Sequence, residues 1–91
     1  MENVEIDIRA LREAEGELEA FKKCLSGHCD DMKDAVSISR SVLKDEKSRQ
    51  ACEKVENACT AIQETLGYVQ RVLERVRDMI AKAEKAEQAE M

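Results

Sequence analysis

Residues 52–83 read CEKVENACTAIQETLGYVQRVLERVRDMIAKA. Two rows of apolar side chains, each with a spacing of seven residues, run through this stretch. The first row comprises Cys52, Cys59, Leu66, Leu73 and Ile80, and the second comprises Val55, Ile62, Val69, Val76 and Ala83. Two such rows form one stripe along a helix, as in coiled coils and helical bundles. The stretch therefore predicts a long amphipathic helix that packs against another helix.

A similar pattern precedes it in the chain. Its main row comprises Val4, Leu11, Leu18, Leu25 and Met32, and we assign the companion row to Ala14, Phe21, Ala35 and Val42. Further apolar residues flank both patterns: Ile8, Val36 and Leu43 in the first, and Ala51, Ala58, Val72, Met79 and Ala86 in the second. About three apolar positions per heptad are expected of a helix with more than one neighbour.

A turn is predicted between the two patterns. Residues 44–50 contain no apolar side chain, and the apolar rows change phase by one residue there. Asp45 or Ser48 is suitably placed to cap the next helix by accepting backbone N–H bonds. Two alternatives remain open: one continuous helix with a skip in its repeat, and three helices separated by a bend at Ser26–Gly27.

We therefore expect an all-α fold, an antiparallel helical hairpin resembling a coiled coil. It forms one domain over residues 1–91, with helices at about 4–43 and 51–86, the turn at about 44–50 and a frayed tail at 87–91. Stripes this wide leave apolar surface uncovered in a lone hairpin, so we expect a four-helix bundle, completed by dimerisation or by a protein partner. The residues predicted to carry this packing are Leu18, Phe21, Leu25, Leu66, Val69, Leu73 and Val76.

The composition argues against several other classes of partner. The net charge is −5, the basic residues are interleaved with acidic ones, and only one Tyr and one Phe are present. A protein surface that binds nucleic acid needs clustered Lys and Arg side chains, usually with aromatic side chains that stack on the nucleobases. No such surface is expected here. No stretch approaches the roughly 20 apolar residues of a membrane span. The first residues lack the pattern of a cleavable signal peptide, which predicts either a cytoplasmic protein or secretion without such a peptide.

The cysteines and the single histidine are the residues that invite special chemistry. We interpret the cysteines as small apolar core residues, because Cys52 and Cys59 lie on a predicted core row. Disulfides are the alternative: Cys24–Cys59 with Cys29–Cys52, which both require a turn near residue 41, or a local Cys24–Cys29 link. A metal site is a further alternative, with candidate ligands Cys24, His28, Cys29, Cys52 and Cys59, although a zinc-type CxxC spacing is absent.

The segment Val42-Leu43-Lys44-Asp45-Glu46-Lys47-Ser48 resembles the turn of the WXG family, small helical hairpins secreted by the bacterial type VII pathway. Many relatives carry Trp-x-Asp in this turn, and Leu43-Lys44-Asp45 occupies the same place mid-chain. Leu43 stands where the family has tryptophan, and Tyr68 is followed four residues later by Val72, where the family's export signal has an acid. The chain is more similar to the helical partners that escort larger secreted toxins, and the resemblance implies such a role.

The sequence thus predicts a non-catalytic protein–protein interaction module without a cofactor. One version is a type VII secretion substrate, or the helical partner or chaperone of a larger secreted protein. The alternatives are an intracellular coiled-coil adaptor or assembly subunit, and a metal or redox protein that uses the Cys and His residues. An enzyme is not expected, because a two-helix seam offers no sizeable pocket.

Overall fold

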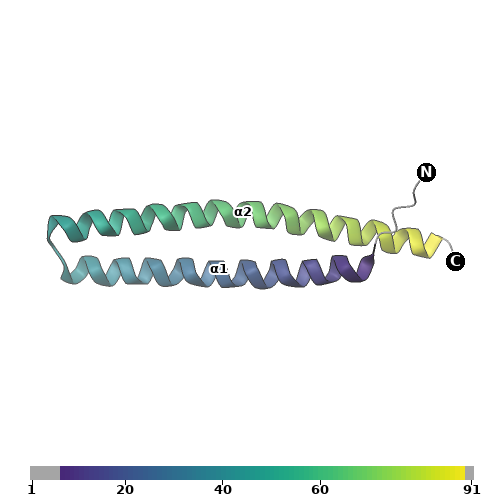
Figure 1. Cartoon of the computed structure of the whole chain (residues 1–91), viewed down its shortest axis with the longest axis horizontal. Coiled ribbons are helices and arrows are strands. Elements are labelled where there is room, and N and C mark those ends of the chain that lie inside the picture. The colour runs from purple at the N-terminus through teal and green to yellow at the C-terminus, as the bar shows by residue number, and fades with distance from the viewer. Residues whose placement is uncertain (1–6, 90–91) are drawn as a thin grey trace.

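The protein is an antiparallel hairpin of two long helices. The computed structural model describes residues 7–89, in which α1 (Ile8–Val42) lies beside α2 (Glu46–Ala89) over its whole length and α2 extends beyond it at the C-terminal end (Figure 1). The molecule measures 69 × 22 × 14 Å, so it is a single layer of two helices. This confirms the all-α hairpin and excludes one continuous helix. Val4 and the last two residues of the predicted tail lie outside the described residues.

Helix α1 is continuous, so the predicted alternative of a bend at Ser26–Gly27 is wrong. Asp7 caps its start, where the carboxylate accepts a 3.2 Å hydrogen bond from the backbone N–H of Ala10. An interior glycine weakens a helix by about 1 kcal/mol relative to alanine. Gly27 lies on the outer face with no neighbouring atom within 4 Å of a Cβ built there, and packing along the opposite face keeps the helix intact.

The turn is shorter than predicted and consists of Leu43, Lys44 and Asp45. Asp45 caps α2. The Asp45 carboxylate accepts one hydrogen bond from the backbone N–H of Ser48, at 3.1 Å, and another from the Ser48 hydroxyl, at 2.7 Å. This confirms Asp45 as the cap and makes Ser48 its donor. Residues 46–50 are therefore helical, not part of the turn as predicted, because a cap lets a polar segment in which only Ser48 is half-buried begin a helix. At its other end α2 continues to residue 89, three residues beyond its predicted end.

The Asp45 cap makes a testable contribution to stability. The hydrogen bonds from Ser48 hold the pKa of the Asp45 carboxyl below its usual value of 3.8. A carboxyl whose pKa is lowered by folding stabilises the fold above its unfolded-state pKa, and that contribution disappears as the pH falls through the folded-state value. We expect Asp45→Ala to lower the urea midpoint at pH 7, measured by circular dichroism, while Asp45→Asn retains most of the capping. A midpoint for Asp45→Ala equal to that of the wild type would contradict the cap.

The α2 half of the seam between the helices is as predicted. All ten residues of the two predicted rows are buried or half-buried, whereas most other α2 side chains are exposed. Leu73 is the only large side chain in the described residues with no exposed surface. The buried members are Cys52, Cys59, Val69, Leu73, Ile80 and Ala83.

The companion row predicted for α1 is wrong. Phe21, Ala35 and Val42 are exposed, and only Ala14 of that row is half-buried. The row that faces α2 comprises Ile8, Glu15, Lys22, Cys29 and Val36, beside the main row of Leu11, Leu18, Leu25 and Met32. Glu15 and Lys22 are able to occupy seam positions because their aliphatic stems pack along the helix while their charged ends reach the surface.

Candidate functional site

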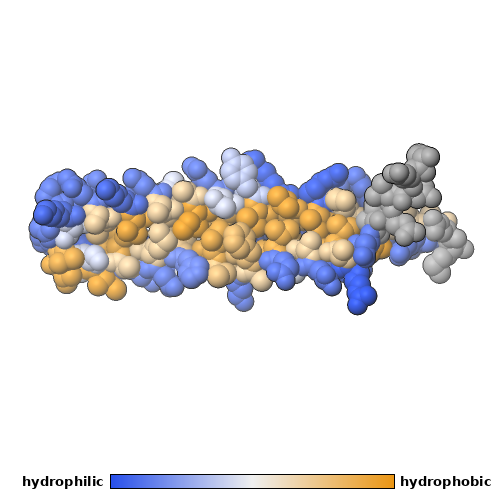
Figure 2. Space-filling model, viewed as in Figure 1, coloured by the Kyte–Doolittle hydropathy of each residue, from blue (hydrophilic) through white to orange (hydrophobic). Residues whose placement is uncertain are grey.

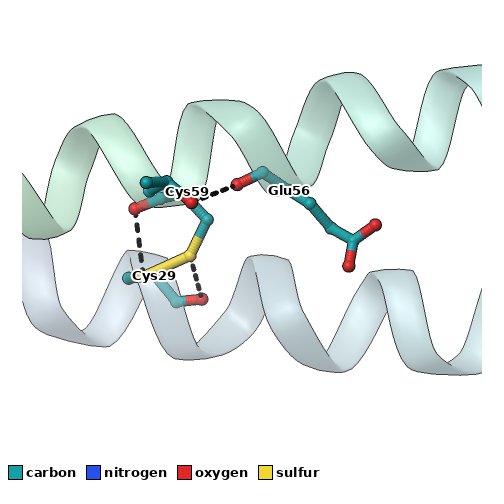
Figure 3. Close-up of a disulfide and its surroundings, with 4 residues drawn as sticks. Cys29, Glu56 and Cys59 are labelled. Atoms are coloured by element: carbon teal, nitrogen blue, oxygen red, sulfur yellow. Dashed lines mark hydrogen bonds between the residues drawn. A yellow bond between two sulfur atoms is a disulfide. The ribbon is translucent and has the colours of Figure 1, made fainter.

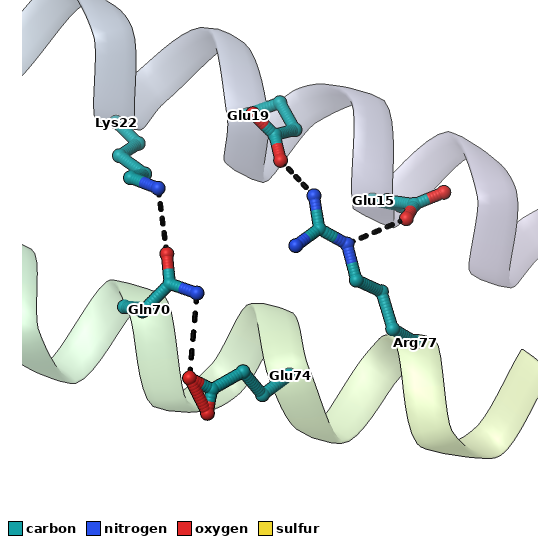
Figure 4. Close-up of polar contacts among 6 residues, drawn as sticks. All are labelled: Glu15, Glu19, Lys22, Gln70, Glu74 and Arg77. Carbon is teal, nitrogen blue, oxygen red and sulfur yellow. Dashed lines mark hydrogen bonds and ion pairs between the residues drawn. The ribbon is translucent and has the colours of Figure 1, made fainter.

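The hairpin has two long edges where the helices meet, and they differ in chemistry. One edge, here called the polar edge, carries ion pairs and hydrogen bonds between the helices (Figure 4). Its α1 residues are Arg12, Glu15, Glu19, Lys22 and Arg40, and its α2 residues are Glu56, Gln70, Arg77 and Glu84. These contacts complete the intramolecular interface on that side.

Arg77 makes two of the ion pairs of the polar edge. Its guanidinium donates to Glu15, with Nε 2.9 Å from the carboxylate, and also pairs with Glu19 (Figure 4). The hydrogen bond to Glu15 raises the pKa of Arg77 above its usual value, although partial burial opposes the shift. Lys22 donates to the side-chain oxygen of Gln70 at 2.6 Å. Exposed pairs of this kind contribute little stability, so their main effect is to fix the pairing of the helices.

The opposite edge, here called the apolar edge, has almost no charge. Its α1 row is Ala14, Phe21, His28, Ala35 and Val42, and its α2 row is Ala51, Ala58, Thr65, Val72, Met79 and Ala86. Both rows flank the seam on the side away from the ion pairs, since each lies one residue before a seam position in the heptad, whereas Glu19 and Arg77 lie one residue after one. Figure 2 views this face and shows an apolar band along the hairpin between hydrophilic margins.

The large apolar side chains that remain exposed gather on this side. Phe21, Val42 and Val72 belong to the apolar edge, with exposed fractions of 48%, 70% and 51%. Ile38 and Tyr68 lie on the rows that border it, and Leu43 lies at the turn. In the described residues no large apolar side chain is exposed on the outer face or on the polar edge. An apolar surface gathered on one side of a molecule is typical of protein-binding surfaces.

The residues predicted to carry packing divide accordingly. Leu18, Leu25 and Leu66 are half-buried in the seam, as is Val76, while Val69 and Leu73 are buried there. Phe21 alone faces outward on the apolar edge. The sequence reasoning missed most residues of this edge as a surface, because it assigned the α1 half to the seam. The signal that identifies the edge is the set of charged side chains on one flank of the seam and their absence from the other.

A groove near the turn extends the apolar edge. It has a volume of about 210 Å³, and its lining comes from both helices and the turn: Ala35, Val36, Ser39, Leu43, Ser48, Ala51, Cys52 and Val55. The floor is formed by the seam and the sides by the apolar edge. A shallow apolar groove between two helices fits a side chain from another helix better than a small polar ligand.

The structure contains a disulfide that the sequence analysis did not predict. Cys29 and Cys59 are bridged across the seam, with their Cα atoms 5.5 Å apart (Figure 3). For Cys29 and Cys59, the interpretation as unpaired core residues is therefore wrong. The pairings considered as alternatives are wrong for them as well. Cys29 lies fifteen residues before Lys44, the centre of the turn, and Cys59 fifteen residues after it, so they face each other. The predicted turn, centred on residue 47, concealed this match.

The other candidate ligands are not brought together. Cys52 is a buried free thiol, as predicted for a core cysteine, whereas Cys24 is an exposed free thiol and His28 is exposed. In residues 7–89 no group of three or more His, Cys, Asp or Glu side chains is arranged to hold a metal ion. The turn residues of the family resemblance, Leu43 and Asp45, lie in the turn and act as helix caps.

Comparison with known proteins adds no assignment: no protein family, curated protein or solved structure matches the chain. The resemblance to WXG proteins therefore stays a prediction. Neither helix, over the part of the chain that the structure describes, combines the length and apolar character needed to cross a membrane.

Proposed function

We propose that this protein is a non-catalytic interaction module that binds a helical protein surface through its apolar edge. The observation that carries the proposal is the asymmetry between the two edges. Ion pairs complete the polar edge, whereas the apolar edge presents Phe21, Val42 and Val72 to solvent. Two helices packed over this edge would bury these side chains in a four-helix bundle.

The size of the exposed surface supports the same function. The chain exposes 7295 Å², whereas a compact folded monomer of its mass, 10.3 kDa, exposes about 5,400 Å². The difference, roughly 1,900 Å², exceeds the 800 Å² or so that each partner buries in a standard protein interface. The hairpin therefore has enough surplus surface for a stable complex.

The Cys29–Cys59 disulfide favours an extracellular setting within this function. Disulfides persist in oxidising compartments and are rare in the reducing cytosol. This supports the type VII expectation of a secreted hairpin or an escort of a secreted protein over the intracellular adaptor. Asp45 gives no independent support for that family, because capping α2 already accounts for it.

The double substitution Phe21→Ser, Val72→Ser tests the function. Valine and serine have similar helix propensities, so we expect the helical content to be retained. Immobilised wild-type protein should retain at least one protein from a source-cell extract that this edge variant fails to retain, with binding weakened about tenfold or more. Circular dichroism and thermal melting should accompany the binding measurement, because Phe21 is partly buried.

The matched control is Ala20→Ser, Ala81→Ser, which places two serines on the exposed outer faces of the same two helices. This control should bind as the wild type does. If the edge variant and the control retained the same proteins to the same extent, the apolar edge would not be the binding surface.

A further inference from the structure

The residues that border the apolar edge carry opposite charges on the two helices. The bordering row of α1 is Ala10, Glu17, Cys24, Asp31 and Ile38, and that of α2 is Lys54, Ala61, Tyr68, Arg75 and Lys82. The charged side chains of the α1 border are thus all acidic, and those of the α2 border are all basic. All five charged side chains belong to exposed residues.

From this pattern we infer that the occupant of the apolar edge is a second copy of this chain, with α1 of each copy packed against α2 of the other. The inference rests on the proposed function and names its partner. In a symmetric dimer each surface must complement itself. If α1 faced α1 of the second copy, the acidic borders would meet, and the basic borders would meet as well. Only the pairing of α1 with α2 brings acids to bases.

This pairing requires a two-fold axis parallel to the long axis of the hairpin. Rotation about such an axis keeps every residue at its own level along the molecule, so the two turns lie at the same end. The facing helices are then antiparallel, as α1 and α2 are within one chain (Figure 1). Four helices, each antiparallel to its two adjacent helices, form an ordinary four-helix bundle.

The levels of the charged residues fit this arrangement. Glu17 lies 27 residues before Lys44, and Arg75 lies 31 residues after it, a mismatch of four residues or about 6 Å. Within the hairpin Glu15 and Arg77 have the same mismatch and are hydrogen-bonded at 2.9 Å. Long side chains bridge such an offset, because they lean toward the N-terminus of their own helix and so converge.

The second acidic residue of the border has no such direct partner. Asp31 lies 13 residues before Lys44, and Lys54 lies 10 residues after it, so the offset of about 4–5 Å runs in the opposite direction and the two side chains lean apart. Their opposite charges add attraction between the borders without a direct contact. Arg75 and Lys82 already contact Asp78 of their own helix, at 3.3 Å and 3.1 Å. Those contacts are solvent-exposed and weak, so they do not prevent pairing with the second copy.

The same symmetry gives Phe21 an apolar environment. Phe21 lies 23 residues before Lys44, and Tyr68 and Val72 lie 24 and 28 residues after it. The phenyl ring of one copy is therefore level with the tyrosine and valine of the other. Aromatic anchors near the centre of an interface contribute most to affinity. Each such contact occurs twice in the dimer.

Reversing the charge of one border tests the inference. The acidic-border variant Glu17→Lys, Asp31→Lys places two basic borders opposite each other, and the basic-border variant Lys54→Glu, Arg75→Glu places two acidic ones. Sedimentation equilibrium at low ionic strength, where charges are least screened, should show a dimer for the wild type. Each variant alone should have a dimer dissociation constant raised about tenfold or more.

Combining the reversed borders should restore association. A 1:1 mixture of the two variants should form a heterodimer, and a single chain with all four substitutions should form a homodimer about as stable as the wild type. The matched control is Glu13→Lys, Asp34→Lys, which makes the same change in net charge on the outer face of α1. This control should remain dimeric. Circular dichroism establishes that every variant is folded.

Two results would overturn the inference. One is a wild-type chain that stays at 10.3 kDa at all concentrations; the other is an acidic-border variant that dimerises as tightly as the control. Neither result decides the proposed function. The wild type could still retain another protein from the extract that the edge variant Phe21→Ser, Val72→Ser does not retain. The chain would then still be an interaction module, with that protein as its partner.

Discussion

Replacement of Leu73 by alanine is expected to lower the free energy of unfolding by about 2–5 kcal/mol. Leu73 is fully buried in the α2 row, one position beyond its centre, and lies opposite the α1 seam position held by Glu15, whose polar end turns toward Arg77. Because small domains are stable by only about 5–15 kcal/mol, this loss is a large fraction of the total.

Urea unfolding followed by circular dichroism measures this effect, with the disulfide kept oxidised. Leu43→Ala is the matched control, since it deletes the same atoms from a side chain that is 50% exposed at the turn. The control should cost clearly less than Leu73→Ala. Equal losses for the two variants would show that the Leu73 seam is not the core of the hairpin.

Loss of the Cys29–Cys59 disulfide is expected to have a comparable effect. The bridge joins cysteines 30 residues apart, and closing a loop of that length in the unfolded chain stabilises the fold by about 3–4 kcal/mol in the chain-entropy account. Reduction should therefore lower the urea midpoint strongly. It should not abolish the seam contacts, because each sulfur lies within 3.8 Å of the opposite cysteine's carbonyl oxygen, an acceptor for the reduced thiol.

Cys59→Ser should reproduce the effect of reduction, and the reductant should then have no further effect. The double variant Cys24→Ser, Cys52→Ser should keep the full response, since it leaves the bridge intact. A thiol count should give one reactive thiol in the native protein, two after unfolding and four after reduction. Four thiols in the unfolded, unreduced protein would contradict the disulfide.

The sequence was sufficient for α2 because every seam position from Cys52 to Ala83 is apolar, so a spacing of seven residues identifies the buried face of that helix directly. It was not sufficient for α1, where Glu15 and Lys22 occupy seam positions and Phe21 and Val42 lie beside them. Hydropathy alone assigns the apolar residue to the core. In the structure Glu15 and Lys22 occupy the seam instead, because they make contacts across to α2 that hydropathy does not reveal.

The turn shows a similar limit. Residues 46–50 lack apolar side chains and were assigned to the turn, but a cap at Asp45 makes them the start of α2. That difference of a few residues changes which cysteines face each other. A pairing that depends on the centre of the turn is predictable only when the capping residue has been identified correctly.

The candidate surface was predictable in kind but not in detail. The width of the apolar stripes predicted that a lone hairpin leaves apolar surface uncovered, and Phe21 and Val72 are exposed. The location of the surface on one edge required the structure, because it depends on which flank of the seam carries Arg77 and its partners.

The mass of the chain in solution tests the central claim, that a second copy of the chain covers the apolar edge, most directly. Sedimentation equilibrium of the wild type should give twice the chain mass of 10.3 kDa, and Phe21→Ser, Val72→Ser should give the mass of a single folded chain. A wild type and an edge variant that sediment alike, both as folded monomers or both as dimers, would contradict the account.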